Sequence, residues 1–349
     1  MSDLQGHYPS FVFFNVLLAT VLSLALGWPT IYLAKRMGLM DVPGALPHKK
    51  HGVAMPYAGG LTLVLTLTFG GLLFNFGMVK ELWMIFVPTL VIFAIGLWDD
   101  FKRLPARTKL AGQLFAAVLL VFLGTSVQII PLHFLGLPGQ TSIAVNWLIT
   151  LVWVVGITNA FNFIDSMDGL AVGVSGVAVA FLILVTLGSS QTSLLQLLTL
   201  MIGTCVGLFF YNLAPAKFFL GDSGAQTLGF LLAAIGILYT PVKYPQASSW
   251  FLPILIFGVP IFDTCLVVFS RWRRGLPVYQ AGHDHTYHRL VTFGLDSTRA
   301  VAVMHIAAVI LGCIAFIALN LEPFYSNLLF GIVLVAGFTI FLLLDKKNG

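Results

Sequence analysis

Long apolar runs alternate with short polar stretches over the whole chain. In windows of about 19 residues these runs predict eleven membrane-spanning helices. The predicted spans are residues 11–34, 57–77, 82–98, 110–130, 145–161, 169–188, 194–213, 225–240, 250–270, 300–320 and 326–344. The first run is long and lacks a basic flank, so we expect a retained helix and not a cleaved signal peptide. The pattern predicts one all-α, polytopic membrane domain covering residues 1–349.

The breaks between the predicted spans differ in charge. Of the 18 Lys and Arg residues, only Lys80 and Lys243 fall on one predicted side, and the other 16 fall on the opposite side. The positive-inside rule assigns the basic side to the cytoplasm. The N-terminus is then outside and the C-terminus cytoplasmic, as an odd number of spans requires.

The composition agrees with a membrane protein. Hydrophobic residues make up 58% of the chain and charged residues 9%, against about 25% charged in soluble domains. The net charge of +5 follows from basic cytoplasmic loops and calls for no nucleic-acid partner. The three cysteines all lie in apolar segments, so they predict neither a disulfide framework nor a zinc site.

The acidic residues gather where predicted spans meet the cytoplasmic side. Carboxylates near lipid are costly unless they are paired, solvated or bound to metal, and they mark functional sites by default. Several such acids on one face therefore predict a site there. They are Asp99 and Asp100, Asp165 and Asp168, Asp222, and Asp263 within the ninth span.

One group of polar residues has the spacing of a helix face. Asn159, Asn162, Asp165 and Asp168 follow each other at intervals of three, so they are neighbours if the segment is helical. Oxygen ligands from Asn and Asp suit a hard cation such as Mg²⁺, which keeps water or phosphate oxygens as its other ligands. The spacing predicts a magnesium site.

Basic residues are predicted beside these acids. Cations bind anionic oxygens directly, while a metal held by the acids neutralises a phosphate from the other side. The combination predicts a phosphate-bearing substrate, met at the membrane surface by a water-soluble nucleotide and a lipid. The basic residues are Lys49, Lys50, Lys109, His285, His288 and Arg289.

Four stretches resemble the polyprenyl-phosphate N-acetylhexosamine-1-phosphate transferases. They are HKKHGVAMPYAGG (48–60), GLWDDFKRLPARTKLAGQ (96–113), NAFNFIDSMDGLAVG (159–173) and NLAPAKFFLGDSGAQTLGF (212–230). A fifth, residues 260–290, matches in outline. They occur in the family's order through most of the chain, and the third and fourth together are highly specific.

The resemblance implies a reaction. A polyprenyl phosphate, undecaprenyl phosphate in bacteria, attacks the β-phosphate of a UDP-sugar, giving a lipid-pyrophosphate sugar and UMP. It implies Mg²⁺ as cofactor, with Mn²⁺ as a substitute, and a bacterial inner-membrane enzyme whose active site faces the cytoplasm and whose product starts cell-envelope polysaccharide synthesis. It also leaves room for a homodimer. Two anions must approach, so a metal that neutralises the diphosphate fits the chemistry.

The resemblance assigns roles by position. Asp99 and Asp100 correspond to the acidic pair on the lipid-phosphate side, in a base or positioning role, although a lipid phosphate largely dianionic at neutral pH needs no base. The remaining roles are metal and diphosphate ligands for Asn162 and Asp222, acids lining the nucleotide site for Asp165 and Asp168, uracil binding for Asn212 and Phe219, and phosphate and sugar contacts for Lys49, Lys109, His285, His288 and Arg289.

Two residues depart from the family pattern. Tyr287 stands where an HxHH motif has a histidine, and Ser166 stands where glycine is common. We expect a UDP-N-acetylglucosamine donor, because the first motif differs from that of the branch using the muramyl-pentapeptide nucleotide. A UDP-6-deoxy-N-acetylhexosamine is the alternative, since the Tyr287 ring could favour an apolar sugar edge.

Two other classes of protein compete with this interpretation. An ion-coupled transporter also carries intramembrane acids, but these belong near the bilayer midplane within repeats. An intramembrane aspartyl protease uses a GLGD segment, and residues 219–222 read FLGD. A second protease motif is absent, and the remaining acids would be unexplained.

Overall fold

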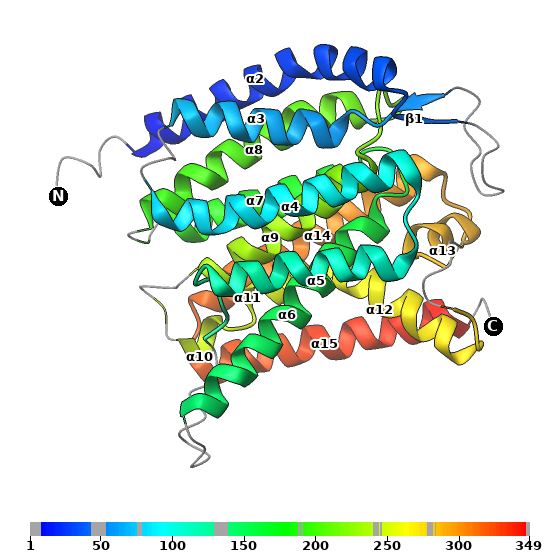
Figure 1. Cartoon of the computed structure of the whole chain (residues 1–349). Coiled ribbons are helices and arrows are strands. Elements are labelled where there is room, and N and C mark those ends of the chain that lie inside the picture. The colour runs from blue at the N-terminus through cyan, green and yellow to red at the C-terminus, as the bar shows by residue number, and fades with distance from the viewer. Residues whose placement is uncertain are drawn as a thin grey trace.

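The computed structural model describes residues 8–42, 54–74, 79–128, 139–187, 189, 191–239, 244, 246–277, 282 and 284–346. The described chain is almost wholly helical (Figure 1). The helices are α2 (Tyr8–Met37), α3 (Gly59–Leu73), α4 (Lys80–Lys102), α5 (Ala106–Phe122), α6 (Gly139–Ile164), α7 (Leu170–Thr186), α8 (Thr192–Asn212), α9 (Gly221–Leu238), α10 (Gln246–Ser249), α11 (Leu252–Ile256), α12 (Gly258–Arg273), α13 (Thr286–Thr292), α14 (Ser297–Leu319) and α15 (Pro323–Lys346). Strands β1 (Met40–Asp41) and β2 (Met55–Pro56) form a short antiparallel pair.

Each predicted span overlaps a helix, but the count of eleven spans is not confirmed. Within the described residues, seven helices are long and apolar enough to cross a membrane: α2, α4, α6, α8, α9, α14 and α15. Helices α3 and α7 have 15 and 17 residues. At about 1.5 Å per residue they reach only about 22–26 Å, short of a hydrocarbon core of about 30 Å. The protein is a multi-pass membrane protein.

The predicted span 250–270 is broken. Residues Gln246–Ile256 and Gly258–Arg273 meet at an angle of 66°, and together they would make an eighth span. Pro260 has no backbone N–H to donate to the Ile256 carbonyl, so the helix cannot continue regularly through this point. A hydropathy window does not detect such a break, because the apolar run itself is continuous.

Helix α9 lies at the centre of the bundle. Of its apolar window, 78% is buried inside the protein, against 17% for the peripheral α15. It packs against α4 and α6, while α2 packs against α8. Contact with α4 is close at Gly96, where an added Cβ would lie 2.6 Å from Ser223 Cα. The end of α4 is thereby fixed against the start of α9.

A backbone ladder attaches the β2 segment to the residues that precede α9. Phe219 N donates to Pro56 O at 3.0 Å, and Gly59 N donates to Phe219 O at 3.1 Å. Gly60 N continues the ladder by donating to Leu220 O at 3.1 Å. The entry to α9 is therefore held by a segment about 160 residues earlier in the chain.

The bundle has one end where the candidate residues gather. Helix α2 begins at the left of Figure 1 and α15 ends at the right, so the first and last described helices run in the same direction. The end of α4 and the starts of α5 and α9 meet at the right, next to α13 (Figure 1).

Candidate active site

Four helices bring the central candidate residues together. Asp99 comes from the last turn of α4, Lys109 from the first turn of α5, Asn162 from the end of α6 and Asp222 from the first turn of α9. In α4 and α6 the polar residues follow a long apolar run, and in α5 and α9 they precede one, so the apolar part of each helix lies in the bundle and the polar part at its end. The structure thus assembles acidic, basic and amide groups from segments far apart in the chain.

Asp222 is the centre of this cluster. Asn162 Nδ2 donates to Asp222 Oδ1 at 2.8 Å, and Lys109 Nζ lies 3.4 Å from Asp222 Oδ2. The same Lys109 ammonium forms an ion pair with the carboxylate of Asp99. The Asp99 side chain is 1% exposed and that of Asp222 is 30% exposed. Asp222 is therefore open to a ligand, while Asp99 is enclosed behind Lys109.

Asp100 holds the first turn of α9. Its Oδ1 accepts from Asp222 N at 2.7 Å, and its Oδ2 accepts from Ser223 N at 3.1 Å and from Ser223 Oγ at 2.5 Å. A carboxylate at a helix N-terminus satisfies unpaired N–H groups and is favoured by the helix dipole. Gly221 has φ +71°, and an added Cβ there would lie 2.7 Å from Asp100 Oδ2. Asp100 thus fixes the backbone that carries Asp222.

A row of amides lies behind the carboxylates. Gln113 Nε2 donates to Gln226 Oε1 at 3.0 Å, and Asn159 Nδ2 donates to Gln113 Oε1 at 2.7 Å. Gln226 Nε2 lies 3.3 Å from Asp222 Oδ1. The sequence analysis missed both glutamines. Their signal was the helical spacing: each stands four residues after a site residue, Lys109 or Asp222.

Asp165 and Asp168 lie in a loop and not on the predicted helical row. Helix α6 ends at Ile164, and Gly169 has φ +75°. Only the two asparagines of the row are therefore helical. Asp168 Oδ2 accepts from Ala216 N at 3.2 Å. Burial, and then the charges of Asp222, Asp100 and Asp168, raise the pKa of Asp165 well above its ordinary value, as expected for a carboxylate among others.

The two residues assigned to uracil differ in their surroundings. Asn212 is buried, its Oδ1 accepts from Gly169 N at 3.1 Å, and its Nδ2 donates to Phe218 O at 3.1 Å. Its amide ties the Asp165–Gly169 loop to the residues before α9. Phe219 is half-buried, and its backbone belongs to the ladder with the β2 segment. The Asn212 side chain is therefore bonded to the residue that precedes Phe219.

The histidine segment is anchored by Asp263, which is fully buried in α12. Asp263 Oδ2 lies 2.8 Å from His285 Nδ1, and its Oδ1 accepts from Thr286 N at 2.6 Å. His285 packs edge-on to Phe163 near the end of α6, with ring centroids 6.3 Å apart. The start of α13 is thus docked beside the Asp165 loop.

Three predicted ligand contacts need comment, because two of the residues are buried and the third lies outside the described residues. The side chain of Tyr287 is 2% exposed, so its ring offers no free face to a sugar and the predicted sugar contact is wrong. Arg289 is 1% exposed; its Nη1 donates to Leu344 O at 2.8 Å and its Nε to Asp284 O at 2.9 Å. It joins α13 to the end of α15. Lys49 lies outside the described residues.

Asp284 also binds the arginines at the end of α12. Arg271 Nε lies 2.7 Å from Asp284 Oδ2 and Arg274 Nη2 lies 2.5 Å from Asp284 Oδ1, while Arg273 pairs with Asp345 at 3.1 Å. Burial acts to raise the pKa of Asp284, but the bonds from Arg274 and Arg271 outweigh it and hold the pKa below its ordinary value. These ion pairs join the end of α12 to Asp284 and to the end of α15, and the positive charges also favour a cytoplasmic position for this end of α12.

Comparison with known proteins gives one family. Residues 82–240 match the sequence profile of glycosyl transferase family 4. A probable undecaprenyl-phosphate N-acetylglucosaminyl 1-phosphate transferase of Bacillus subtilis is 31% identical over 288 residues, covering 82% of this chain and 78% of the relative. A decaprenyl-phosphate N-acetylglucosaminephosphotransferase of Mycobacterium tuberculosis is 30% identical over 346 residues, covering 88% and 83%. An undecaprenyl-phosphate alpha-N-acetylglucosaminyl 1-phosphate transferase of Escherichia coli is 26% identical over 300 residues, covering 82% and 78%.

Proposed function

Because this chain belongs to glycosyl transferase family 4, we propose that it transfers N-acetylglucosamine 1-phosphate from UDP-N-acetylglucosamine to a polyprenyl phosphate. An oxygen of the lipid phosphate attacks the β-phosphorus of the donor, and the bond from that phosphorus to the oxygen of UMP breaks. The products are UMP and a lipid-pyrophosphate sugar that begins an envelope polysaccharide. The relatives favour neither a transporter nor a protease.

The observation that carries the proposal is the convergence of Asp222, Asn162 and Lys109. Lys109 Nζ lies within 3.4 Å of Asp222 Oδ2, so a cation and an anion face the same space. A reaction between two phosphates needs both: cations to bind anionic oxygens and acids to hold a metal. Asp99, paired with Lys109, orients that ammonium toward the lipid phosphate.

The residues fit Mg²⁺ as the cofactor. In the described part of the chain no three His, Cys, Asp or Glu residues stand close enough to hold a metal by themselves. Mg²⁺ usually takes one or two carboxylates and completes its shell with water and substrate phosphates. Asp222 and Asn162 would hold it, with Asp165 nearby; when bound, it would neutralise the diphosphate and the charge on UMP. Mn²⁺ would serve with the same ligands.

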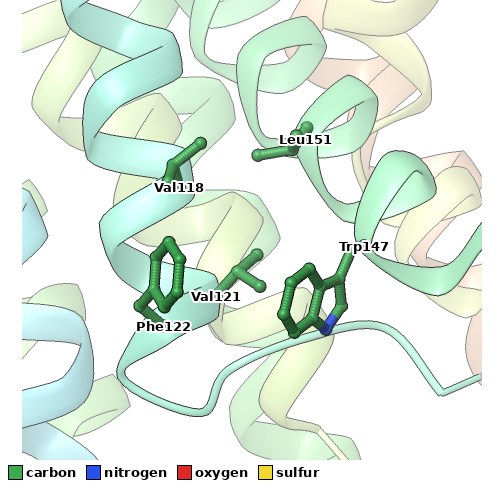
Figure 2. A pocket seen from close by; sticks show the side chains of 5 residues that line it. All are labelled: Val118, Val121, Phe122, Trp147 and Leu151. Atoms are coloured by element: carbon green, nitrogen blue, oxygen red, sulfur yellow. The ribbon is translucent and has the colours of Figure 1, made fainter. Parts of the chain in front are cut away.

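The membrane helices suit the lipid substrate. Side chains of α5 and α6 line an open apolar pocket, formed by Val118, Val121, Phe122, Trp147 and Leu151 (Figure 2). Phe122 ends the helix on which Lys109 stands in the first turn. At about 1.5 Å per residue the two are about 20 Å apart, so an isoprenoid chain whose phosphate meets Lys109 could extend along α5.

The proposal includes a location. Basic loops predict that the end of the bundle bearing Asp99 and Asp222 faces the cytoplasm, where UDP-sugars are made. In a bacterium this is the cytoplasmic (inner) membrane. Fusing a reporter enzyme to the end of α15 tests the orientation, and activity only on the outer side contradicts it.

The activity is tested with purified protein, undecaprenyl phosphate, Mg²⁺ and a panel of UDP-sugars that includes a 6-deoxy-N-acetylhexosamine. We expect UMP release and a lipid product whose mass corresponds to an added N-acetylglucosamine phosphate. Release of UMP that does not depend on the lipid would contradict the transfer. If the enzyme prefers the 6-deoxy donor, the proposed donor sugar is wrong and the proposed reaction still holds.

A further inference from the structure

Gln226 and Gln113 are buried polar residues to which the proposed function gives no role. Gln226 is on α9 and 1% exposed, and Gln113 is on α5 and 2% exposed. An amide inside a helical bundle is costly unless its N–H and C=O groups are paired. Both glutamines are paired, and the row that they form with Asn159 of α6 ends on the carboxylate of Asp222.

This carboxylate decides which way each amide in the row points. An ionised carboxylate only accepts hydrogen bonds, so Gln226 turns its Nε2 to Asp222 Oδ1, at 3.3 Å, and its Oε1 away. That oxygen accepts from Gln113 Nε2 at 3.0 Å. Gln113 Oε1 accepts from Asn159 Nδ2 at 2.7 Å, and the same Nδ2 donates to Val155 O at 2.8 Å. Each amide therefore donates toward Asp222, and the last one is anchored to the backbone of α6.

The row acts on one of the two carboxylate oxygens. Asp222 Oδ1 accepts from Gln226 Nε2 and, at 2.8 Å, from Asn162 Nδ2. Asp222 Oδ2 lies 3.4 Å from Lys109 Nζ, on the side of the cation. Two amide donors on Oδ1 fix the rotation of the carboxylate about its last bond. They leave Oδ2 as the oxygen that is directed toward Lys109.

We propose that Gln226 and Gln113 are positioning residues for Asp222: the amide row holds Oδ1, so that Oδ2 is the oxygen presented to Mg²⁺. The inference rests on the proposed function for the assignment of Asp222 as a metal ligand. Hydrogen bonds from outside a metal site orient the ligating carboxylates, and metal affinity falls when they are removed. Neither glutamine touches the metal or the substrate, since both side chains are buried.

The test is a titration of Mn²⁺ into the purified full chain in lipid nanodiscs, with free Mn²⁺ measured by electron paramagnetic resonance. Gln226→Met keeps a long unbranched side chain and removes the donor. We expect the Kd for Mn²⁺ to rise about three- to tenfold, at the low end of the range for such partners, because Asn162 keeps its bond to Oδ1. UMP release should fall at limiting Mg²⁺ and recover at excess Mg²⁺.

Gln113→Met tests the row one step further from the metal. It leaves the bond between Gln226 and Asp222 in place and removes the donor to Gln226 Oε1, so the Gln226 amide is free to turn. We expect the Kd for Mn²⁺ to rise about two- to threefold. Adding Gln113→Met to Gln226→Met should cause no further rise, because residues in one hydrogen-bond network are coupled.

Thr158→Val is the matched control. Thr158 precedes Asn159 on α6, is fully buried and lies at the contact with α9, where an added Cβ at Gly229 would lie 2.9 Å from Thr158 Cα. Its hydroxyl donates to Val154 O of its own helix at 2.7 Å. Valine keeps the shape and removes the hydroxyl, so this variant changes the same interface and keeps the amide row. We expect an unchanged Kd for Mn²⁺ and unchanged UMP release.

An unchanged Kd in Gln226→Met would overturn the inference, as would equal rises in Gln226→Met and Thr158→Val, or a loss of UMP release that excess Mg²⁺ does not restore. If Gln226→Met does not fold, the comparison of Gln113→Met with Thr158→Val decides. A wild type that binds Mn²⁺ and releases no UMP refutes the proposed reaction, while the Kd values still decide this inference. A wild type that binds no Mn²⁺ overturns the metal assignment and this inference with it.

Discussion

Asp100→Asn changes one atom of the carboxylate that holds the start of α9. The carboxylate accepts three hydrogen bonds, two from backbone N–H groups and one from the Ser223 hydroxyl. Asparagine keeps one acceptor oxygen, and its amide nitrogen must face an N–H donor of Asp222 or Ser223. We therefore expect a loss of both stability and activity.

The size of the loss follows from the bonds. A hydrogen bond to a charged group contributes about 1.5–3 kcal/mol, and the charge at the helix N-terminus adds about 0.3–1 kcal/mol. Losing one such bond and the charge gives about 2–4 kcal/mol. With an unfolding entropy of about 2.1 cal/mol/K per residue on the scale of soluble proteins, the 349-residue chain would melt about 3–6 °C lower.

The assay measures the melting temperature of the detergent-solubilised protein by size-exclusion fluorescence, together with UMP release. Turnover should fall at least about tenfold, because a catalytic group displaced by about 1 Å loses much of its effect. Ser223→Ala is the graded control. It removes the hydroxyl bond and keeps both backbone bonds, so its melting temperature should fall by about 1–2 °C.

One result would refute the reasoning. If Asp100→Asn lost turnover with an unchanged melting temperature, and Ser223→Ala lost neither, Asp100 would act on the substrate and not on the helix. Full activity with a lowered melting temperature would show that α9 can shift without displacing Asp222.

Three further predictions concern the metal ligand Asp222, the residues assigned to the uracil base, and Asp165 in the loop after α6. Asp222→Asn should lower turnover at least about a hundredfold with folding intact; substantial activity at limiting Mg²⁺ would remove Asp222 from the metal site. Phe219→Ala and Asn212→Ala should each weaken UMP and UDP binding together, about three- to tenfold for the lost stacking, as measured by calorimetry; only Asn212→Ala should also lower the melting temperature, and unchanged UMP affinity in both would place the base elsewhere. Because the pKa of Asp165 is raised in the folded protein, its contribution to stability is present below the unfolded pKa of about 4 and is lost as pH rises through the folded pKa. Asp165→Asn in metal-free buffer should therefore raise the melting temperature at pH 8 and not at pH 4. Equal shifts of the melting temperature at both pH values would show that the Asp165 charge does not destabilise the folded protein.

Hydropathy alone predicted where the helices lie, because a 20-residue apolar run has few other structures available in lipid. It did not predict the 66° bend at Phe257, because the apolar run continues through the bend, and it did not predict how short α3 and α7 are. Within the described residues seven helices, or eight spans if the bent pair counts as one, meet the length and apolarity of a membrane span, so the predicted count of eleven is not confirmed.

The sequence predicted which residues form the candidate site better than it predicted the contacts between them. Asp99, Lys109, Asn162 and Asp222 do come together, and acidic residues at helix ends were the signal. The anchoring role of Asp100 could not be predicted from the sequence, because its partner Ser223 lies 123 residues away. Arg289 stands next to the histidines in sequence, but one helical turn directs its guanidinium to the end of α15.

The two neighbouring acids of α4 differ in when their partners become available during synthesis. Asp99 pairs with Lys109, ten residues later, so a hairpin of α4 and α5 is enough to neutralise it. Asp100 waits for α9, and until then its charge has no partner from that helix. An acidic residue in a membrane helix costs about 2.5–3.5 kcal/mol at the bilayer centre and less toward the surface.

The position of Asp100 in the last turn of its helix keeps that interim cost small, because water can reach it. The ribosome must add more than a hundred residues between the acid and its partner, and at about 5–20 residues per second this takes several seconds or more. The half-finished chain therefore spends that time with an acidic end on α4 whose Asp100 carboxylate lacks its hydrogen-bond donors from α9, and with no assembled site around Asp222. Assembly of the membrane bundle, and not the making of any one helix, is the event that switches the enzyme on.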